Sequence, residues 1–487
     1  MYDSYEQLSA DLKTKPADFW VKKGEEYALE LFHRAAEKVP AYQDFLSKNS
    51  VDHKKIITIE DFKSGVPVID KENYIYKYSL SELCWNGDVT QSSLISQSSG
   101  TTGSPHFWPR FAKYDKDLKL VHEVFFKDLY NTDNKKTLFV VCFYLGAHIA
   151  GVVTTNAVRD ILSDGMKGSI VTAGINKKDI FSTINKLSPL FDQTILMGYP
   201  PFLRDIILDG KNDDVGIDWK KINLKFMFSA ESFPENWRDN LYKNSGINNF
   251  LQSGFNVYGC SEVGFMGHES EFTIKLRKFL ENNSESRSLF GLANGYVPAI
   301  YQYHPWNKYF ESINNHLVCT SDNGLPLIRY DIKDIGVVYK TDEIKEKFSS
   351  KIDIENIWNL PIITVFGRSD YTATIYGVNV YPEHIKAVIA KDNFINLIGD
   401  KFFLKTVFED GEQSLEIHLE LLPNVDKQLC LSDNFSSIFF DNLLHVNIEY
   451  HKLYDVVGKK VKPKLFFYEN GSENFYSLKA KNKYIIK

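Results

Sequence analysis

The alternation of apolar and polar positions in the middle of the chain predicts an α/β fold. Between residues 136 and 262, short apolar runs alternate with stretches that have helical spacing. Buried strands that alternate with helices are typical of parallel β-α units, so we expect a mostly parallel sheet here. The strand-like runs are Thr137 to Tyr144, Ser169 to Ala173, Thr194 to Met197 and Leu224 to Phe228, and the clearest helical segment is Lys178 to Leu187.

One amphipathic helix is predicted near the N-terminus. Glu25 to Val39 carries apolar residues at positions 28, 31, 32, 35 and 39, which fall on one helical face, and Pro40 ends the pattern. The most apolar window, Leu138 to Val153, is shorter than the roughly 20 residues that cross a bilayer. We expect this window to be a buried strand that leads into a helix.

Length and composition indicate a globular protein of at least two domains. The chain has 487 residues, more than the about 250 to 300 that one hydrophobic core organises. Apolar residues make up 43% and charged residues 25%, which excludes a disordered or fibrous chain. The first residues lack the basic start and apolar stretch of a secretory signal, so a cytoplasmic protein is expected. The five cysteines show no paired spacing, and neither a disulfide framework nor a zinc site is indicated.

The net charge of −6 is unevenly distributed along the chain. Residues 451–487 hold nine Lys against Asp455, Glu469 and Glu473, a balance of +6. Such a tail suits a solvated surface, a nucleic-acid patch or a small domain that closes over phosphates. The motifs described next favour the third interpretation, with no nucleic-acid or membrane partner.

A run of small residues after position 97 predicts a phosphate-binding loop. Glycine allows a tight turn and a close approach to a ligand, and hydroxyls and successive backbone N–H groups can surround phosphate oxygens. A flexible linker is the alternative, but Phe107-Trp108-Pro109 follows at once. The run reads Ser98-Ser99-Gly100-Thr101-Thr102-Gly103-Ser104-Pro105.

This loop resembles the phosphate loop of the adenylate-forming enzymes, the acyl-CoA synthetase superfamily. Further motifs in the family's order extend the resemblance over nearly the whole chain, and their details are most similar to the phenylacetate-CoA ligase branch. The most branch-specific match is Gly377-Val378-Asn379-Val380-Tyr381-Pro382. The resemblance implies a large N-terminal adenylation domain over residues 1–369, with mostly parallel sheets flanked by helices and a β-rich subdomain. A small mobile α+β C-terminal lid domain would span residues 370–487.

The resemblance also assigns a nucleotide site. The loop residues Ser98 to Gly103 would bind phosphates, Ser229-Ala230-Glu231 would lie against adenine, and Tyr258 within Tyr258-Gly259-Cys260-Ser261-Glu262 would stack on it. Glu262 is the expected Mg²⁺ ligand, and a single carboxylate beside phosphates is sufficient for that ion. Asp334 would accept hydrogen bonds from the ribose hydroxyls, with Asp331 as its local competitor.

The C-terminal part supplies the remaining predicted roles. Arg368 would contact ribose or phosphate, and Asp370 would be the hinge of the lid domain. Lys479, in Leu478-Lys479-Ala480-Lys481, is the candidate catalytic lysine, with Lys481 as its rival. The acyl pocket is expected at Phe143, Tyr144, His148, Gly198, Tyr199 and Pro200, although these residues would also suit an ordinary core.

Two departures from the family pattern stand out. The phosphate loop has Ser104 and His106 where the family carries a lysine, so a cation facing pyrophosphate is missing; Arg110 or His106 are the candidate substitutes. The glycine before the catalytic lysine is replaced by Leu478.

The implied activity is a two-step ligase. ATP, with Mg²⁺, would activate a small carboxylic acid, such as an aryl or arylacetic acid, to an acyl-adenylate, and CoA would then take up the acyl group. Two alternatives stay open: transfer of the acyl group or of AMP to another acceptor, and a non-catalytic homologue that binds nucleotide or acyl ligand. The resemblance also leaves a homodimer open.

Overall fold

The computed structural model describes residues 2–97, 106–146, 149–283, 290, 296–353, 357–369, 371–409, 412–475, 482 and 484–486. They form two compact units. Unit 1 comprises Met1–Glu231, Ser245–Lys275 and Ile300–Thr364, and unit 2 comprises Ser232–Asn244, Leu276–Ala299 and Val365–Lys487. The second unit thus takes in two mid-chain segments beside the C-terminal residues. The predicted boundary between residues 369 and 370 stays a prediction.

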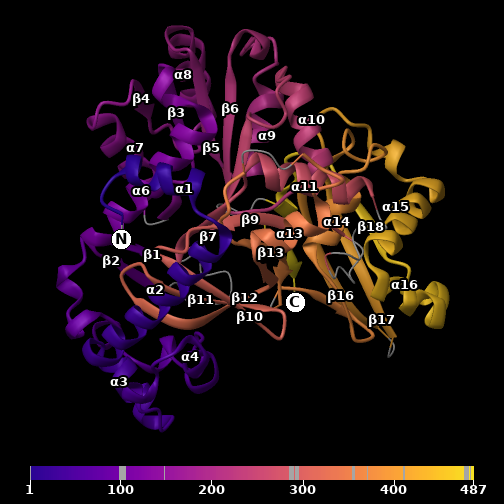
Figure 1. Cartoon of the computed structure of the whole chain (residues 1–487). Coiled ribbons are helices and arrows are strands. Elements are labelled where there is room, and N and C mark those ends of the chain that lie inside the picture. Colours follow the sequence, from indigo (N-terminus) through magenta and orange to yellow (C-terminus); the bar gives the residue numbers. More distant parts are fainter. Residues whose placement is uncertain are drawn as a thin grey trace. The chain divides into compact units, whose positions relative to one another are not determined.

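The central sheet is an eleven-stranded mixed sheet, with the order β10-β11-β12-β13-β9-β8-β7-β6-β5-β3-β4 (Figure 1). The strands β4, β3, β5, β6 and β7 are parallel neighbours. The predicted apolar runs correspond to β3, β4, β5 and β6, whereas β7 was not among them. Every side chain of β3 and β5 is buried, because helices cover both faces of a parallel sheet. The parallel strands are β3 (Thr137–Cys142), β4 (Gly168–Val171), β5 (Gln193–Gly198), β6 (Leu224–Ser229) and β7 (Gly254–Cys260).

The other half of the sheet contains antiparallel pairs. β8 turns back on β7, and β10, β11 and β12 form an antiparallel meander. The predicted β-rich part is therefore continuous with the parallel strands in one sheet. Its strands are β8 (Gly264–His268), β9 (Ala299–Tyr303), β10 (Lys308–Ile313), β11 (His316–Asp322), β12 (Pro326–Tyr339) and β13 (Ile362–Arg368), and a separate hairpin holds β1 (Leu94–Gln97) and β2 (Phe107–Arg110).

The predicted amphipathic helix is the greater part of α2 (Ala17–Lys38), which ends before Pro40. The helices α6 and α7 bury aromatic and aliphatic residues with one face of the parallel strands, and Phe125, Phe126 and Phe139 are fully buried in this core. α6 is Ala112–Tyr130 and α7 is Ile149–Ser163. The other helices of unit 1 are α1 (Tyr5–Thr14), α3 (Pro40–Lys48), α4 (Ile59–Gly65), α5 (Leu80–Leu83), α8 (Lys177–Leu187), α9 (Pro200–Asp209) and α13 (Thr341–Phe348). α10 (Glu235–Ser245) belongs to unit 2 except for its last residue, and α11 (Glu271–Asn282) has residues in both units.

Unit 2 is built around a four-stranded sheet with the order β18-β17-β16-β19. β16 and β17 are antiparallel, and β18 and β19 join them as parallel neighbours. The helix α14 packs against β16 and against α15. The elements are β14 (Ala373–Ile375), β15 (Val378–Val380), α14 (Pro382–Ile389), β16 (Ile398–Glu409), β17 (Glu412–Leu421), α15 (Asp433–Val446), α16 (Ile448–Val457), β18 (Lys464–Tyr468) and β19 (Ile485–Ile486).

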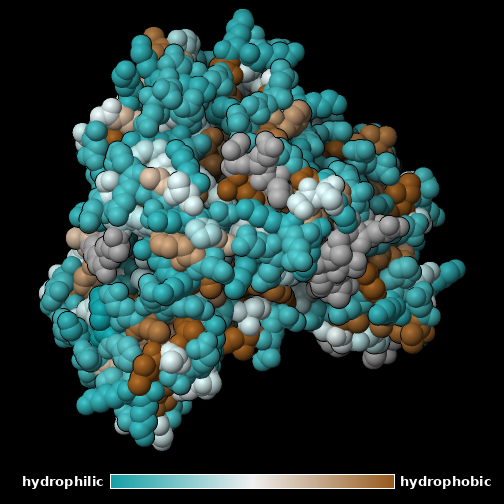
Figure 2. Space-filling view, viewed as in Figure 1, coloured by the Kyte–Doolittle hydropathy of each residue, from teal (hydrophilic) through white to brown (hydrophobic). Residues whose placement is uncertain are grey.

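Hydrophilic side chains cover most of the face seen in Figure 2, and hydrophobic ones are scattered among them. Within the described ranges, no helix has both the length and the apolar character that a membrane span requires. The fold class expected from the sequence, an α/β protein with a large sheet flanked by helices and a smaller α+β part, is confirmed.

Candidate functional site

The carboxyl ends of four parallel strands in unit 1 meet at one edge of the sheet. Cys142 at the end of β3 lies beside Gly198 of β5, Gly198 lies beside Phe228 of β6, and Ser229 lies beside Val257 of β7. Ligands of open α/β sheets bind outside this edge. The predicted acyl, adenine and metal residues in unit 1 follow these strands directly, so the topology brings them to the same edge.

Tyr258 and Asp334 are in direct contact at this edge. The Tyr258 hydroxyl donates a hydrogen bond to Oδ2 of Asp334, although β7 and β12 are distant in the sequence. The Tyr258 ring is stacked on Tyr301, with ring centroids 5.2 Å apart and planes 13° from parallel. Burial, reinforced by the neighbouring Asp334 carboxylate, raises the pKa of Tyr258 well above its usual value. The hydroxyl therefore stays protonated and anchors the carboxylate.

Asp331, the alternative to Asp334, has other partners. Lys333 Nζ donates to Oδ2 of Asp331 at 2.9 Å, and the His316 ring lies 3.2 Å from the same carboxylate oxygen. These contacts bind Asp331 into the surface of β11 and β12. Of these two carboxylates, the described contacts join Asp334 to Tyr258 and Asp331 to Lys333 and His316. The ribose contact stays a prediction for Asp334, with Asp331 as its competitor.

The predicted adenine segment forms the connection after β6. Ser229 Oγ donates to the Val257 carbonyl at 3.2 Å, which ties the segment to β7. Ala230 has a φ of +78°, a left-handed conformation that is strained for a residue with a Cβ. The Glu231 carbonyl accepts a hydrogen bond from Asn256 Nδ2 at 2.9 Å. Such outliers occur at ligand sites, and the surrounding hydrogen bonds hold this one in place.

Glu262 stands on the tight turn between β7 and β8 and forms an ion pair with Lys71, with Nζ and Oε1 2.5 Å apart. Burial raises the pKa of the Glu262 carboxyl, but the Lys71 ammonium and hydrogen bonds from Lys71, from its own backbone and from Cys260 outweigh this effect and lower it overall. The pKa of Lys71 is raised in return. Burial would lower it, but the negative charge of Glu262 and the hydrogen bond to it outweigh that effect. Both groups are therefore charged at neutral pH.

The sequence did not predict Lys71. It reaches the site because Ile69 pairs with β12: the Ile69 N–H donates to the Arg329 carbonyl at 3.0 Å, and the Asp331 N–H donates to the Ile69 carbonyl at 2.8 Å. The segment just before Lys71 carries none of the motifs described in the sequence analysis. No spacing rule links that segment to the Glu262 turn.

Two further motif residues shape the same turn. Gly259 lies so close to the returning strand that a Cβ there would be 2.6 Å from the Gly264 carbonyl oxygen. The Ser261 carbonyl accepts a hydrogen bond from Nη2 of Arg110 at 2.5 Å. A side chain at position 259 would therefore clash with the returning strand, so glycine is required there. The buried Arg110 holds the turn through its hydrogen bond to the Ser261 carbonyl.

The predicted acyl residues fall into two groups at the sheet edge. Gly198, Tyr199 and Pro200 lie where β5 leads into α9, and the Tyr199 hydroxyl donates to Oε2 of Glu231. Phe143 is buried after β3, whereas the neighbouring Tyr144 is 43% exposed. Tyr199 therefore links the predicted acyl and adenine segments directly.

Several predicted residues lie outside the described part of the chain. These are the phosphate-loop residues Ser98, Ser99, Gly100, Thr101, Thr102 and Gly103, together with His148, Asp370 and Lys479. Arg368 is described as the last residue of β13, within unit 2. The roles predicted for all of these residues stay predictions.

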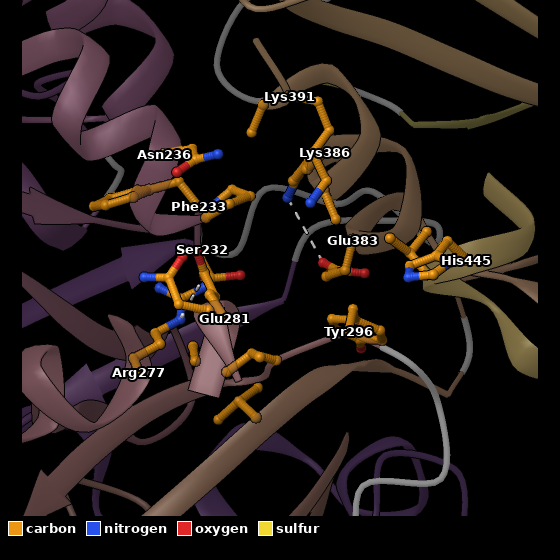
Figure 3. A pocket seen from close by; sticks show the side chains of 18 residues that line it. Ser232, Phe233, Asn236, Arg277, Glu281, Tyr296, Glu383, Lys386, Lys391 and His445 are labelled. Atoms are coloured by element: carbon orange, nitrogen blue, oxygen red, sulfur yellow. Dashed lines mark ion pairs between the residues drawn. The ribbon is translucent and has the colours of Figure 1, made fainter. Parts of the chain in front are cut away.

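Unit 2 contains a cavity of about 110 Å³ that the sequence did not predict (Figure 3). Lys386 and Glu383 of α14 face each other in it at 3.6 Å, and Glu281 accepts a hydrogen bond from the Glu235 N–H at 3.1 Å. Burial and the nearby Glu235 raise the pKa of Glu281 to about 7, although Arg277 opposes the shift. The cavity is therefore lined by both positively and negatively charged side chains, and some of them form ion pairs with each other.

The fold that carries this edge is the fold of the adenylate-forming enzymes. 2-Hydroxyisobutyryl-CoA ligase, in the postadenylation state with R3-HIB-AMP, is similar with a TM-score of 0.67 and 13% identity over 98% of this chain and 91% of that chain. The acyl acid amido synthetase AtGH3.15, in complex with 2,4-DB, is similar with a TM-score of 0.62 and 14% identity, over 98% of this chain and 90% of that one.

No protein-family model and no curated protein sequence matches the chain. The likeness to the two ligases is therefore a likeness of fold, and the phenylacetate-CoA ligase branch stays a prediction. The likeness to each of the two ligases covers 98% of this chain, so it is not limited to the central sheet.

Proposed function

We propose that this protein activates a carboxylic acid with ATP. The acid's carboxylate oxygen attacks the α-phosphorus, the bond to the bridging oxygen of the β-phosphate breaks, and pyrophosphate leaves with that bonding pair. The acyl group of the acyl-adenylate then passes to a thiol, which we propose to be that of CoA, and AMP leaves.

The observation that carries the proposal is the meeting of Tyr258, Asp334, Glu262 and Lys71 at the carboxyl edge of one sheet. Three of the four were predicted from two sequence motifs: Tyr258 and Glu262 belong to one, and Asp334 belongs to the other. In this assignment Tyr258 provides the adenine platform. Asp334 would accept the ribose hydroxyls with its carboxylate oxygens.

Mg²⁺ fits the Glu262 turn. Among the described residues, no group of three or more His, Cys, Asp or Glu side chains is arranged to hold a metal. A Mg²⁺ ion that keeps waters and phosphate oxygens needs only one or two carboxylates, and Glu262 is ionised with 11% of its side chain exposed. Bound there, the ion would neutralise phosphate charge as a Lewis acid.

We propose that Lys71 takes the place of the lysine that is missing from the phosphate loop. Its ammonium lies at the proposed metal ligand, so a triphosphate at this edge would meet a cation from residue 71 in place of one from residue 104 or 106. His106 is a weaker substitute, because burial, with Lys71 nearby, lowers its pKa. Lys479 is proposed to supply the second cation during adenylation.

The acceptor in the second step distinguishes two versions of the proposal. The similar solved structures include a CoA ligase and an amido synthetase, which share this fold but transfer acyl groups to different acceptors. A requirement for CoA in the release of AMP would favour the thioester version, and AMP release with an amino acid and no CoA would favour the amide version.

The proposal is tested by trapping acyl-adenylates with hydroxylamine over a panel of aryl, arylacetic and fatty acids, with pyrophosphate release as the second readout. We expect hydroxamate with at least one acid, and loss of the signal in Glu262→Gln. ATP binding without hydroxamate for any acid would instead support the non-catalytic alternative, and no ATP binding would reject the proposal.

A further inference from the structure

A buried arginine connects two segments that the proposed function assigns to the triphosphate. Arg110 is the last residue of β2, which pairs with β1, and the predicted phosphate loop lies between these two strands in the sequence. Its Nη2 donates to the carbonyl of Ser261, in the turn that presents Glu262, at 2.5 Å. Its backbone carbonyl accepts from the Ser93 N–H at 2.7 Å at the base of the hairpin. One side chain thus spans the two segments.

Arg110 is in an unusual environment for an arginine. Its side chain is 0% exposed, and no carboxylate within the described ranges lies within ion-pair distance of it. Nε donates to Ser96 Oγ at 3.4 Å, the guanidinium lies 4.8 Å from the centre of the Tyr114 ring, and Nη1 is buried without a hydrogen-bond partner. Burial lowers the Arg110 pKa, although the acidic groups around it, Tyr114, Cys260, Asp115 and Glu262, oppose this shift. Arginines are rarely fully buried unless paired.

The turn is built to fit this arginine. Gly264 has a φ of +76°, and a Cβ there would come within 2.2 Å of the Tyr114 hydroxyl and 3.4 Å of Arg110 Nη1. The other side of the turn is held by Asn323, whose Nδ2 donates to the Val263 carbonyl. Lys308, also buried, donates to Oδ1 of Asn323 at 3.3 Å. The carbonyls before and after Glu262 are therefore both fixed by buried donors.

A buried cation without a carboxylate partner costs stability, so its presence needs a compensating role. We propose that Arg110 is a positioning residue: it fixes the Glu262 turn relative to β1 and β2, so that Glu262 is held where it can meet a Mg²⁺-bound triphosphate. This inference rests on the proposed function. It adds a residue that touches no substrate and acts through the Ser261 carbonyl.

Arg110→Met tests the proposal, because methionine keeps much of the apolar volume and removes the charge and the donors. Lys225→Met is the matched control, since Lys225 is a buried lysine of the same sheet, and its hydrogen bonds to described residues go to the Gln252 carbonyl and Ser253 Oγ, which are not part of the turn. Arg110→Lys keeps the charge with a single shorter donor and serves if the methionine variant fails to fold.

The first readout needs no ligand. Hydrogen exchange of the Val263 and Gly264 amides is expected to rise at least tenfold in Arg110→Met and to stay unchanged in Lys225→Met. Global stability of Arg110→Met is expected to match or exceed that of the wild type, since a desolvated charge has been removed. Unchanged exchange at the turn would overturn the proposal.

The second readout is calorimetric ATP binding with and without Mg²⁺. We expect the gain in affinity that Mg²⁺ gives the wild type to fall at least tenfold in Arg110→Met, less in Arg110→Lys and not in Lys225→Met. A gain retained in Arg110→Met would reject the positioning role. If the wild type binds no ATP, the proposed function fails, whereas faster exchange confined to the turn would still support Arg110 as its brace.

Discussion

The hydroxyl of Tyr258 is hydrogen-bonded to the carboxylate of Asp334, and this contact joins β7 to β12 at the ligand edge of the sheet. The carboxylate is thereby oriented before any nucleotide arrives. A preorganised acceptor loses less entropy on binding than one that must be ordered by the ligand. The tyrosine would therefore contribute both as a ring under adenine and as a positioning group for the ribose contact.

Asp334→Asn is expected to raise the KM for ATP by roughly 10- to 100-fold, because a hydrogen bond to a charged group contributes about 1.5–3 kcal/mol. Tyr258→Phe keeps the ring and loses the bond to Asp334, so a smaller rise of a few-fold is expected. Acid-dependent pyrophosphate exchange as a function of ATP concentration measures both. Asp331→Asn is the control, since Asp331 is occupied by Lys333 and His316, and an equal effect there would contradict the assignment.

Lys71→Met is expected to move the acid limb of the activity profile to higher pH. The Lys71 charge lowers the pKa of Glu262, so removing it raises that pKa, and the carboxylate protonates earlier as the pH falls. The measurement is pyrophosphate exchange against pH at limiting Mg²⁺. Lys71→Arg should keep the wild-type limb. A limb that does not move in Lys71→Met would show that the ion pair does not control the ionisation of Glu262.

The sequence predicted the parallel strands and the edge residues because their information is local. β3, β4, β5 and β6 are short runs of four to six residues, and Tyr258 and Glu262 belong to one short motif. The contact between Lys71 and Glu262 and the hydrogen bond from Arg110 to Ser261 depend instead on which distant segments pair. No local sequence pattern predicts that Ile69 pairs with β12. The same holds for the joining of the antiparallel and parallel strands into one sheet.

The histidines in the core of unit 1 predict acid sensitivity. Burial lowers the pKa of His122 and of His268 to about 4, from an ordinary value of 6.5. The unfolded chain therefore binds more protons below pH 6.5, and stability is full above that pH and falls as the pH drops towards 4. Each group contributes up to about 3 kcal/mol to this loss, at 1.36 kcal/mol per pKa unit.

Urea unfolding midpoints between pH 7.5 and 4.5 measure the effect. His122→Phe replaces a ring whose Nε2 is buried without a hydrogen-bond partner, while Nδ1 lies 2.8 Å from the Leu118 carbonyl. This variant should lose less stability on acidification than the wild type. Parallel curves for the two proteins would mean that other groups cause the acid sensitivity.

Lys479→Ala separates the two half-reactions of the proposed ligase. In the proposed scheme this lysine neutralises the charge that develops on the phosphate oxygens during adenylation, and the thiol step does not use it. Acid-dependent pyrophosphate exchange should fall by at least a hundredfold, whereas thioester formation from supplied acyl-adenylate and CoA should stay within a few-fold of the wild type. Lys481→Ala, two residues along the same lysine-rich tail, is the matched control and should keep both half-reactions. If exchange survives in Lys479→Ala and is lost in Lys481→Ala, the catalytic lysine is Lys481. If both variants lose both half-reactions, the tail supports the structure of unit 2 and the proposed division of the reaction is wrong.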